Sequence, residues 1–273
     1  MLAGIVTYNP DISRLRENIN AIYPQVDELI IIDNGSANIN DILKLDINII
    51  CNSQNEGISF ALNQIMNYAY EHSHSWFLTL DQDSVVMPDL INQYKNYLNY
   101  DKIGIITSLI KDRNNNNDIK KLSTPYQYVD MCITSGSLNN TEIIKSIGGY
   151  DTNLFIDAVD NDITYRIRKS EYCILKINYI GLIHENGMID NHNLFGKCFI
   201  MYNESPLRVY YISRNLLYEF RKFNEKEFLA LYFKNLFKTL FFQKNKKIYL
   251  KCFFYGTYDF FKGCTGKCIR KIY

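Results

Sequence analysis

The sequence has no run of about 18 apolar residues, the length that a membrane-spanning helix needs. Met1 is followed directly by the short apolar run 2–6, without the basic and longer apolar regions of a secretory signal. The charges of 30 Lys+Arg and 29 Asp+Glu nearly cancel, so the chain lacks the positive excess of a dedicated nucleic-acid-binding protein. We therefore expect a cytoplasmic chain without a nucleic-acid partner.

The seven cysteines also lack the paired short spacings of a zinc site or a disulfide framework. Cys264 and Cys268 are four residues apart, and no second pair completes a ligand set. Without a secretory signal we expect reduced thiols that act as small apolar residues.

What the sequence does have is an uneven distribution of charge. Residues 1–207 hold 15 Lys+Arg and 25 Asp+Glu, whereas residues 208–273 hold 15 and 4. The last quarter also carries 19 of the 39 aromatic residues. Such asymmetry indicates a charged interaction surface on one part of the chain. We predict an acidic front domain over 1–204 and a basic, aromatic, helical region over 205–273.

Strand and helix patterns alternate in the front portion. Short apolar runs predict strands, and helical spacing predicts helices after Asp11, over Glu56–Tyr70 and after Pro88. The predicted strands are Leu2–Thr7, Leu29–Ile32, Ile47–Cys51, Trp76–Leu80 and Ile103–Leu109. This alternation predicts an α/β fold, a Rossmann-like, mostly parallel sheet flanked by helices. Ligands of such sheets bind beyond the carboxyl ends of the strands, where the polar clusters 7–10, 33–36 and 81–84 fall.

Two acidic clusters suggest chemistry at that edge. Asp81-x-Asp83 follows an apolar strand, and two such carboxylates can share Mg²⁺ or Mn²⁺ with phosphate oxygens. The alternative is a turn that only caps the next helix. Further along, Asp157, Asp160 and Asp162 fall within six residues, more acidic groups than a helix cap requires.

Several motifs occur in a fixed order: Val6-Thr7-Tyr8-Asn9, Ile32-Asp33-Asn34-Gly35-Ser36, Asn55-x-Gly57-x-x-x-Ala61-x-Asn63, Asp81-Gln82-Asp83 and Gly148-Gly149-Tyr150-Asp151. With these motifs the sequence resembles glycosyltransferase family 2, which implies the GT-A fold with a nucleotide-sugar half over about 1–110 and an acceptor half over about 111–204. Further residues resemble the bacterial rhamnosyltransferase branch: Leu154-Phe155-Ile156-Asp157, Asp160-x-Asp162, Arg166, His184, Tyr210-Tyr211-x-x-Arg214-Asn215 and Gly256-x-x-Asp259-x-x-x-Gly263-x-x-Gly266-Lys267.

The resemblance implies a role for each nucleotide-site residue. Asp33 accepts a hydrogen bond from the pyrimidine N3–H, for which an ionised carboxylate is suited. Asp83 ligates a metal that bridges the diphosphate, with Asp81 facing the ribose or the metal. The other donor-site residues are Thr7, Tyr8 and Asn9 beside the nucleotide, and Asn55, Gly57 and Asn63 in the base and ribose pocket.

The acceptor base of an inverting enzyme comes from the acidic motif before a helix. Spacing back from Arg166 favours Asp160 as this base, with Asp162 two residues on. The family's usual motif has Glu immediately before the base, whereas this chain has Val159, so Asp157 remains an alternative.

The resemblance also suggests two basic ligands for the diphosphate or its metal. His184 sits at the end of an apolar run, where neutral imidazole can ligate a metal. Arg214 can reach the diphosphate. The alternatives are a packed histidine and an arginine that borders the core.

The tail interleaves lysines with aromatic residues at helical spacing. This pattern is typical of helices on an anionic membrane surface, where lipid-linked acceptors are found. We expect a peripheral location at the inner face of the cell membrane. The alternative is an appendage that packs its aromatics on the sheet domain or on a twin subunit in a homodimer.

Together, these expectations describe a metal-dependent inverting glycosyltransferase. The resemblance implies transfer of L-rhamnose from dTDP-rhamnose to a glycan or lipid-linked acceptor, in O-antigen, capsule or cell-wall synthesis. One alternative is the same fold with a UDP-sugar of glucose, galactose, N-acetylglucosamine or galactofuranose. Another is a non-catalytic sugar-nucleotide-binding or scaffold subunit, which would not need an acceptor base.

Overall fold

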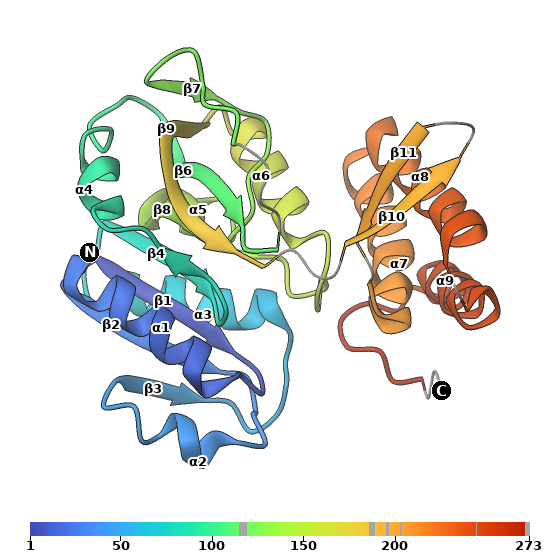
Figure 1. Cartoon of the computed structure of the whole chain (residues 1–273), viewed down its shortest axis with the longest axis horizontal. Coiled ribbons are helices and arrows are strands. Elements are labelled where there is room, and N and C mark those ends of the chain that lie inside the picture. Colours follow the sequence, from blue (N-terminus) through green and yellow to red (C-terminus); the bar gives the residue numbers. More distant parts are fainter. Residues whose placement is uncertain (115–118, 186–188, 195–196, 203, 244, 271–273) are drawn as a thin grey trace. The chain divides into compact units, whose positions relative to one another are not determined.

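A computed structural model describes residues 1–114, 119–185, 189–194, 197–202, 204–243 and 245–270 (Figure 1). The chain forms two compact units, and each is described by itself. The first unit comprises Met1–Asp151 and Asp160–Glu185; the second comprises Thr152–Val159 and Asn186–Tyr273. The predicted boundary at 204–205 therefore lies inside the second unit, with which residues 186–204 group.

A parallel sheet forms the front of the first unit, as predicted. Its strands are β1 (Leu2–Thr7), β2 (Glu28–Asp33), β3 (Asn48–Cys51) and β4 (Trp76–Asp81), in the spatial order β3-β2-β1-β4. The buried strands β1, β2 and β4 are nearly continuous apolar runs, because helices cover both faces of such sheets. Thr7 pairs with Asp33 and Val6 with Asp81, so these strands end at one edge.

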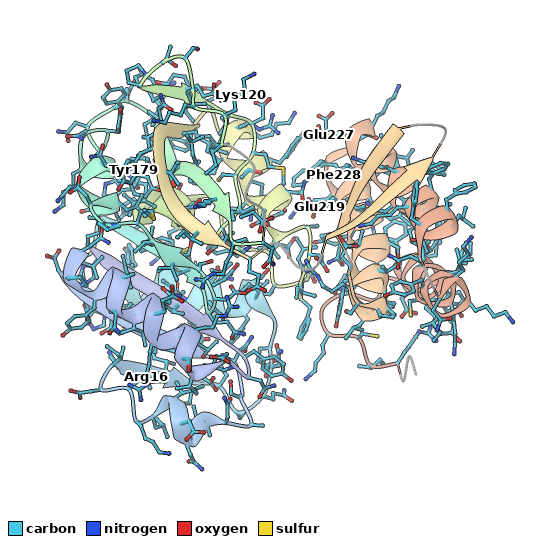
Figure 2. The ribbon with its side chains drawn as sticks, viewed as in Figure 1. Arg16, Lys120, Tyr179, Glu219, Glu227 and Phe228 are labelled. Carbon is cyan, nitrogen blue, oxygen red and sulfur yellow. The ribbon has the colours of Figure 1, made fainter. Side chains whose placement is uncertain are left out.

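The sheet continues with strands of mixed direction. The order runs on from β4 through β8 (Ser137–Asn140), β6 (Ile103–Asp112), β9 (Cys173–His184) and β5 (Val85–Val86), and β7 (Tyr126–Tyr128) also pairs with β9. β8 runs antiparallel to both β4 and β6. Register shifts interrupt the β6–β9 ladder. Tyr179 of β9, labelled in Figure 2, donates a hydrogen bond to the Pro88 carbonyl.

Helices of the first unit begin where the sequence predicts caps. In α1 (Ile12–Ile22) the Asp11 carboxylate accepts the Arg14 N–H, and the apolar positions of the helix pack into the core. Helix α3 (Ile58–Glu71) starts after Gly57, whose φ of 94° suits glycine. The remaining helical segments are Tyr23–Gln25 (3-10), α2 (Ile39–Ile42), α4 (Leu90–Lys95), α5 (Thr141–Ser146) and α6 (Val159–Lys169).

The second unit combines a hairpin with three helices. The hairpin strands are β10 (Ile189–Leu194) and β11 (Lys197–Tyr202), and the helices are α7 (Pro206–Phe223), α8 (Lys226–Phe242) and α9 (Lys246–Phe261). Ser205 caps α7, Pro206 occupies its first turn, and Asn224 ends it in the left-handed conformation. Glu219 of α7 and Phe228 of α8, labelled in Figure 2, are buried. Among the described residues, no helix is both long enough and apolar enough to cross a bilayer.

Candidate active site

Three potential metal ligands converge at the carboxyl edge of the sheet in the first unit. Asp81 ends β4, Asp83 lies two residues on, and His184 ends β9. One ligand atom from each lies within 4.8 Å of the other two, and all three side chains are half-buried. Two carboxylates and an imidazole fit a hard divalent cation such as Mg²⁺ or Mn²⁺.

A chain of hydroxyl groups orients this cluster. Ser84 Oγ lies 2.8 Å from His184 Nδ1, which leaves Nε2 as the nitrogen for a cation. Ser135 Oγ donates to Ser84 Oγ at 2.8 Å and accepts the Asp81 backbone N–H at 3.0 Å. Asn18 of α1 donates to the Asp81 carbonyl at 2.8 Å. Supporting hydrogen bonds of this kind are typical of metal sites, but sequence motifs do not show them. The only feature of the sequence that pointed to Ser84 was its position directly after Asp83.

The loop 134–136 joins the cluster of potential metal ligands to Asp160. The Thr134 N–H donates to Asp160 Oδ1 at 2.7 Å, and the next residue, Ser135, holds Asp81 and Ser84. Consecutive Cα atoms are about 3.8 Å apart, so this loop brings the predicted base and the predicted ligands into one site. Gly136 closes the turn at a φ of 75°, and its carbonyl accepts the Tyr94 hydroxyl at 2.6 Å.

The three aspartates of the acidic stretch have different surroundings. Asp162 is buried and pairs with Arg166, whose Nη1 and Nη2 also donate to the carbonyls of Ile147 and Gly149. This network ties α6 to a turn, so it favours a structural role for Asp162. Asp157 belongs to the second unit and pairs with Arg208. Asp160 is half-buried in the first turn of α6 and is the member of the stretch that the loop 134–136 links to Asp81 and Ser84.

Asp33 has its acceptor positions occupied within the protein. Thr7 Oγ1 and Ser36 Oγ donate to Oδ1, and the backbone N–H groups of Gly35 and Ser36 donate to Oδ2. A carboxylate offers about four acceptor positions. The predicted contact with a pyrimidine N3–H stays a prediction and requires one of these donors to give way.

The other donor-site residues divide into two groups. Asn55 lies beside Asp33, because its Oδ1 accepts from the Asn34 side chain at 3.2 Å and from the Gly57 N–H at 2.9 Å. Exposed Tyr8 and Asn9 flank the same edge, with Asn9 N–H donating to Ser36 Oγ at 2.8 Å. The amide of Asn63 instead holds the N–H and C=O of Tyr150, both at 2.7 Å, which favours a structural role there.

Arg214 lies in the second unit and is 2% exposed. Its guanidinium stands 5.4 and 5.0 Å from the ring centres of Tyr210 and Tyr211, and Nε donates to Asn215 Oδ1 at 3.0 Å. Within the described part of the chain, Nη1 and Nη2 have no hydrogen-bond partner. Buried donors without partners are costly, so this arginine suits an anionic ligand, and its contact with a diphosphate stays a prediction.

Cys132 is a buried thiol near this site. Burial raises the pKa of the Cys132 thiol to about 12, and the neighbouring Asp160 carboxylate adds to the effect. The raised pKa favours the protonated thiol, so Cys132 fits the predicted role of a small buried apolar residue, whereas Cys51 and Cys264 are exposed and do not.

The fold and site define a class: a GT-A sheet with an Asp-x-Asp cluster at its carboxyl edge, as in nucleotide-sugar-dependent transferases. The sequence model of "Glycosyl transferase family 2" matches residues 3–163. The chain therefore belongs to glycosyltransferase family 2. It is 29% identical to the dTDP-rhamnosyl transferase RfbF of Shigella flexneri, with 97% of this chain and 96% of that protein covered.

Solved structures share the fold. TarS 1–349 of S. aureus superposes with a TM-score of 0.58 at 13% identity, covering 93% of this chain and 80% of that one. The mannosyltransferase PcManGT of Pyrobaculum calidifontis, in complex with GDP-Man and Mn²⁺, superposes with a TM-score of 0.53 at 13% identity. The match covers 81% of this chain and 64% of that one. GalNAc-T7 with UDP, GalNAc and Mn²⁺ superposes with a TM-score of 0.54 at 15% identity, and the match covers 75% of this chain and 45% of that one. At these identities the likeness shows the fold alone, and it confirms the GT-A prediction.

Proposed function

We propose that this chain is an inverting, metal-dependent rhamnosyltransferase that transfers L-rhamnose from dTDP-rhamnose to a glycan or lipid-linked acceptor of a cell-surface polysaccharide. The relative named dTDP-rhamnosyl transferase RfbF, alike over nearly the full length of both chains, supports the donor. One observation carries the reaction type: the loop 134–136 links Asp160 to the cluster Asp81, Asp83 and His184.

The residues of the first unit divide the reaction between them. Asp160 takes the proton of the acceptor hydroxyl as that oxygen attacks the anomeric carbon of the sugar. The bond from this carbon to the diphosphate oxygen breaks on the opposite side, and dTDP leaves with the electron pair. Asp81, Asp83 and His184 would hold Mg²⁺ or Mn²⁺, which supplies stabilisation for the charge on the departing diphosphate.

We further propose that the second unit binds an anionic membrane surface, where lipid-linked acceptors are found. Phe233, Phe237 and Phe241 of α8 recur at helical spacing and are 57, 47 and 54% exposed. On α9, Phe254, Tyr258 and Phe261 also recur at helical spacing and are 55, 50 and 76% exposed. Exposed Lys234, Lys247 and Lys251 accompany them and suit lipid phosphates. Lys244, another lysine of the basic tail, lies outside the described residues.

A donor panel tests the proposal. Thermal-shift and calorimetric titrations with Mn²⁺ would compare dTDP-rhamnose with UDP-glucose, UDP-galactose, UDP-N-acetylglucosamine and UDP-galactofuranose. We expect dTDP-rhamnose to stabilise the protein most. Preferential stabilisation by a UDP-sugar would overturn the rhamnose assignment and support the alternative donor on the same fold.

A further inference from the structure

The loop 152–158, directly before α6, has an unusual backbone. Asp157 and Ala158 both adopt φ of 65°, in the left-handed region that non-glycine residues rarely occupy. Helix α6 begins at the next residue, Val159, and Asp160 follows in its first turn. Two such residues in succession persist only where the surroundings hold them.

Asn215 of α7 holds this loop at its most unfavourable point. Its Nδ2 donates to the Ile156 carbonyl at 2.8 Å and to the Asp157 carbonyl at 3.0 Å. Its Oδ1 accepts from Arg214 Nε at 3.0 Å, which fixes the direction of the amide. Asn215 is 1% exposed, so water does not compete for these bonds.

Two further contacts from α7 support the same loop. Arg208 donates from Nε to Asp157 Oδ1 at 3.1 Å and also pairs through Nη2, while the Asp157 side chain is 8% exposed. The Tyr211 ring stacks on Phe155, with ring centres 5.4 Å apart and planes 16° from parallel. Helix α7 therefore holds the Asp157 side chain, the Phe155 ring and the backbone of the loop.

The C-terminal segment holds the loop and α7 from another direction. Gly266 N–H donates to the Asn153 carbonyl at 2.8 Å, and Thr265 Oγ1 donates to Asn153 Oδ1 at 2.9 Å. Cys268 N–H donates to the Tyr211 hydroxyl at 2.8 Å. Gly266, one of the motif glycines of the tail, therefore belongs to the arrangement that fixes this loop.

We propose that Asn215 is a positioning residue for glycosyl transfer: it locks the left-handed turn at 157–158 and thereby sets the entry of α6 and the carboxylate of Asp160. The inference rests on the proposed function of Asp160 as the base. The Asp157–Arg208 ion pair gives Asp157 a place in the lock instead of a role as the base. Both Asp157 and Asn215 lie in sequence motifs, but the motifs do not distinguish a positioning residue from a base.

The experiment compares Asn215→Ala with Ser213→Ala in the full chain. Ser213 is on the same helix and equally buried, but its hydroxyl donates to the carbonyls of Tyr210 and Phe253, away from the loop. For Asn215→Ala we expect kcat for transfer to fall at least tenfold, because displacement of a catalytic group by about 1 Å can cost 10²-fold. KM for the donor and dTDP binding should stay within twofold, since the predicted nucleotide residues other than Arg214 lie in the first unit and the Arg214 side chain itself is kept. Ser213→Ala should retain kcat within threefold.

Two readouts separate positioning from general destabilisation. Hydrogen exchange of residues 152–164 should rise in Asn215→Ala and remain unchanged in Ser213→Ala. Replacing Ala158 by Gly removes the side-chain cost of the left-handed turn, so Asn215→Ala should lose less kcat in an Ala158→Gly background.

Unchanged kcat in Asn215→Ala, parallel loss of dTDP binding, or an equal loss in both backgrounds would overturn the inference. Asp160→Asn, assayed alongside, separates this failure from that of the proposed function. If Asp160→Asn retains transfer, the base assignment itself is wrong; if it abolishes transfer while Asn215→Ala does not alter it, only the lock is wrong.

Discussion

At the scale of single residues, surroundings decide what identical side chains do. Asp157, Asp160 and Asp162 look equivalent in the sequence, yet one pairs with Arg208, one accepts from the Thr134 backbone, and one is buried against Arg166. A buried carboxylate in an ion pair stabilises structure, whereas a half-buried one beside a metal cluster suits proton transfer. Spacing back from Arg166 pointed to Asp160, but only the fold distinguishes its neighbours' roles.

Asp83→Asn tests the predicted metal group at this scale. We expect transfer to fall at least 100-fold, because an amide ligates a hard cation much less strongly than a carboxylate does. EDTA should inactivate the wild-type protein to a similar extent, and added Mn²⁺ should restore only the wild type. Asp130→Asn, a change at an 87% exposed carboxylate, serves as the control. Full activity of Asp83→Asn after EDTA treatment would rule out the metal group.

Asp259 predicts a pH dependence of stability. Burial alone would raise the pKa of its carboxyl, but the Arg270 guanidinium and Tyr210 hydroxyl more than offset this and hold the pKa below its usual value. The stabilisation is therefore present above the ordinary pKa of 3.8 and is lost as pH falls through the lower folded-state value.

Arg270→Met should reverse the sign of this shift. Burial then raises the pKa of Asp259, so the destabilisation is present at neutral pH and is relieved as pH falls through the raised value, instead of appearing at low pH as in the wild type. At neutral pH we expect a lower free energy of unfolding, because the Asp259 carboxylate is left poorly paired. Thermal unfolding between pH 7 and 3 measures both effects. Arg168→Met, which breaks a surface pair with exposed Asp130, should change little; equal acid sensitivity of the two variants would contradict the account.

At the scale of elements, the prediction succeeded where a segment carries its own signal. The apolar runs before Asp33 and Asp81 gave β2 and β4, and the Asp11 cap gave α1. The β10–β11 hairpin was not predicted. The length of β9, a strand of 12 residues, was also missed, because Lys176, Asn178 and Gly181 interrupt its apolar pattern and register shifts break the ladder. Pairing with the distant strand β6 forms β9, and local sequence does not record it.

Helices α8 and α9 carry the prediction of membrane binding at this scale. Replacing Phe233, Phe237 and Phe241 by Ser should greatly reduce flotation with vesicles containing anionic lipid. These rings form the apolar face that such helices bury to a depth of about 5–10 Å in the membrane interface. Binding should also weaken with salt, since the lysines act through long-range attraction. Tyr23→Ser, at a 60% exposed ring of the first unit, controls for loss of an exposed aromatic. Flotation equal to that of the wild type would contradict the proposal.

At the scale of the whole molecule, the near-neutral charge conceals a division between the two units. The first unit holds 14 Lys+Arg and 22 Asp+Glu, and the second holds 16 and 7, which corresponds to net charges of −8 and +9. The acidic unit carries the predicted metal and base groups, and the basic unit carries the exposed aromatic stripes. In the sequence, charge and aromatic content differ between residues 1–207 and 208–273. The grouping of residues 152–159 with the second unit depends on long-range packing, which local sequence does not record.

The central claim is that Asp160 deprotonates the acceptor, and Asp160→Asn tests it most directly. The measurement pairs mass-spectrometric detection of rhamnosyl transfer with calorimetric binding of dTDP in Mn²⁺. We predict at least a 100-fold loss of transfer with dTDP affinity within twofold of the wild type, because the amide keeps the Thr134 contact but accepts no proton at neutral pH. Transfer within threefold of the wild type would contradict the assignment.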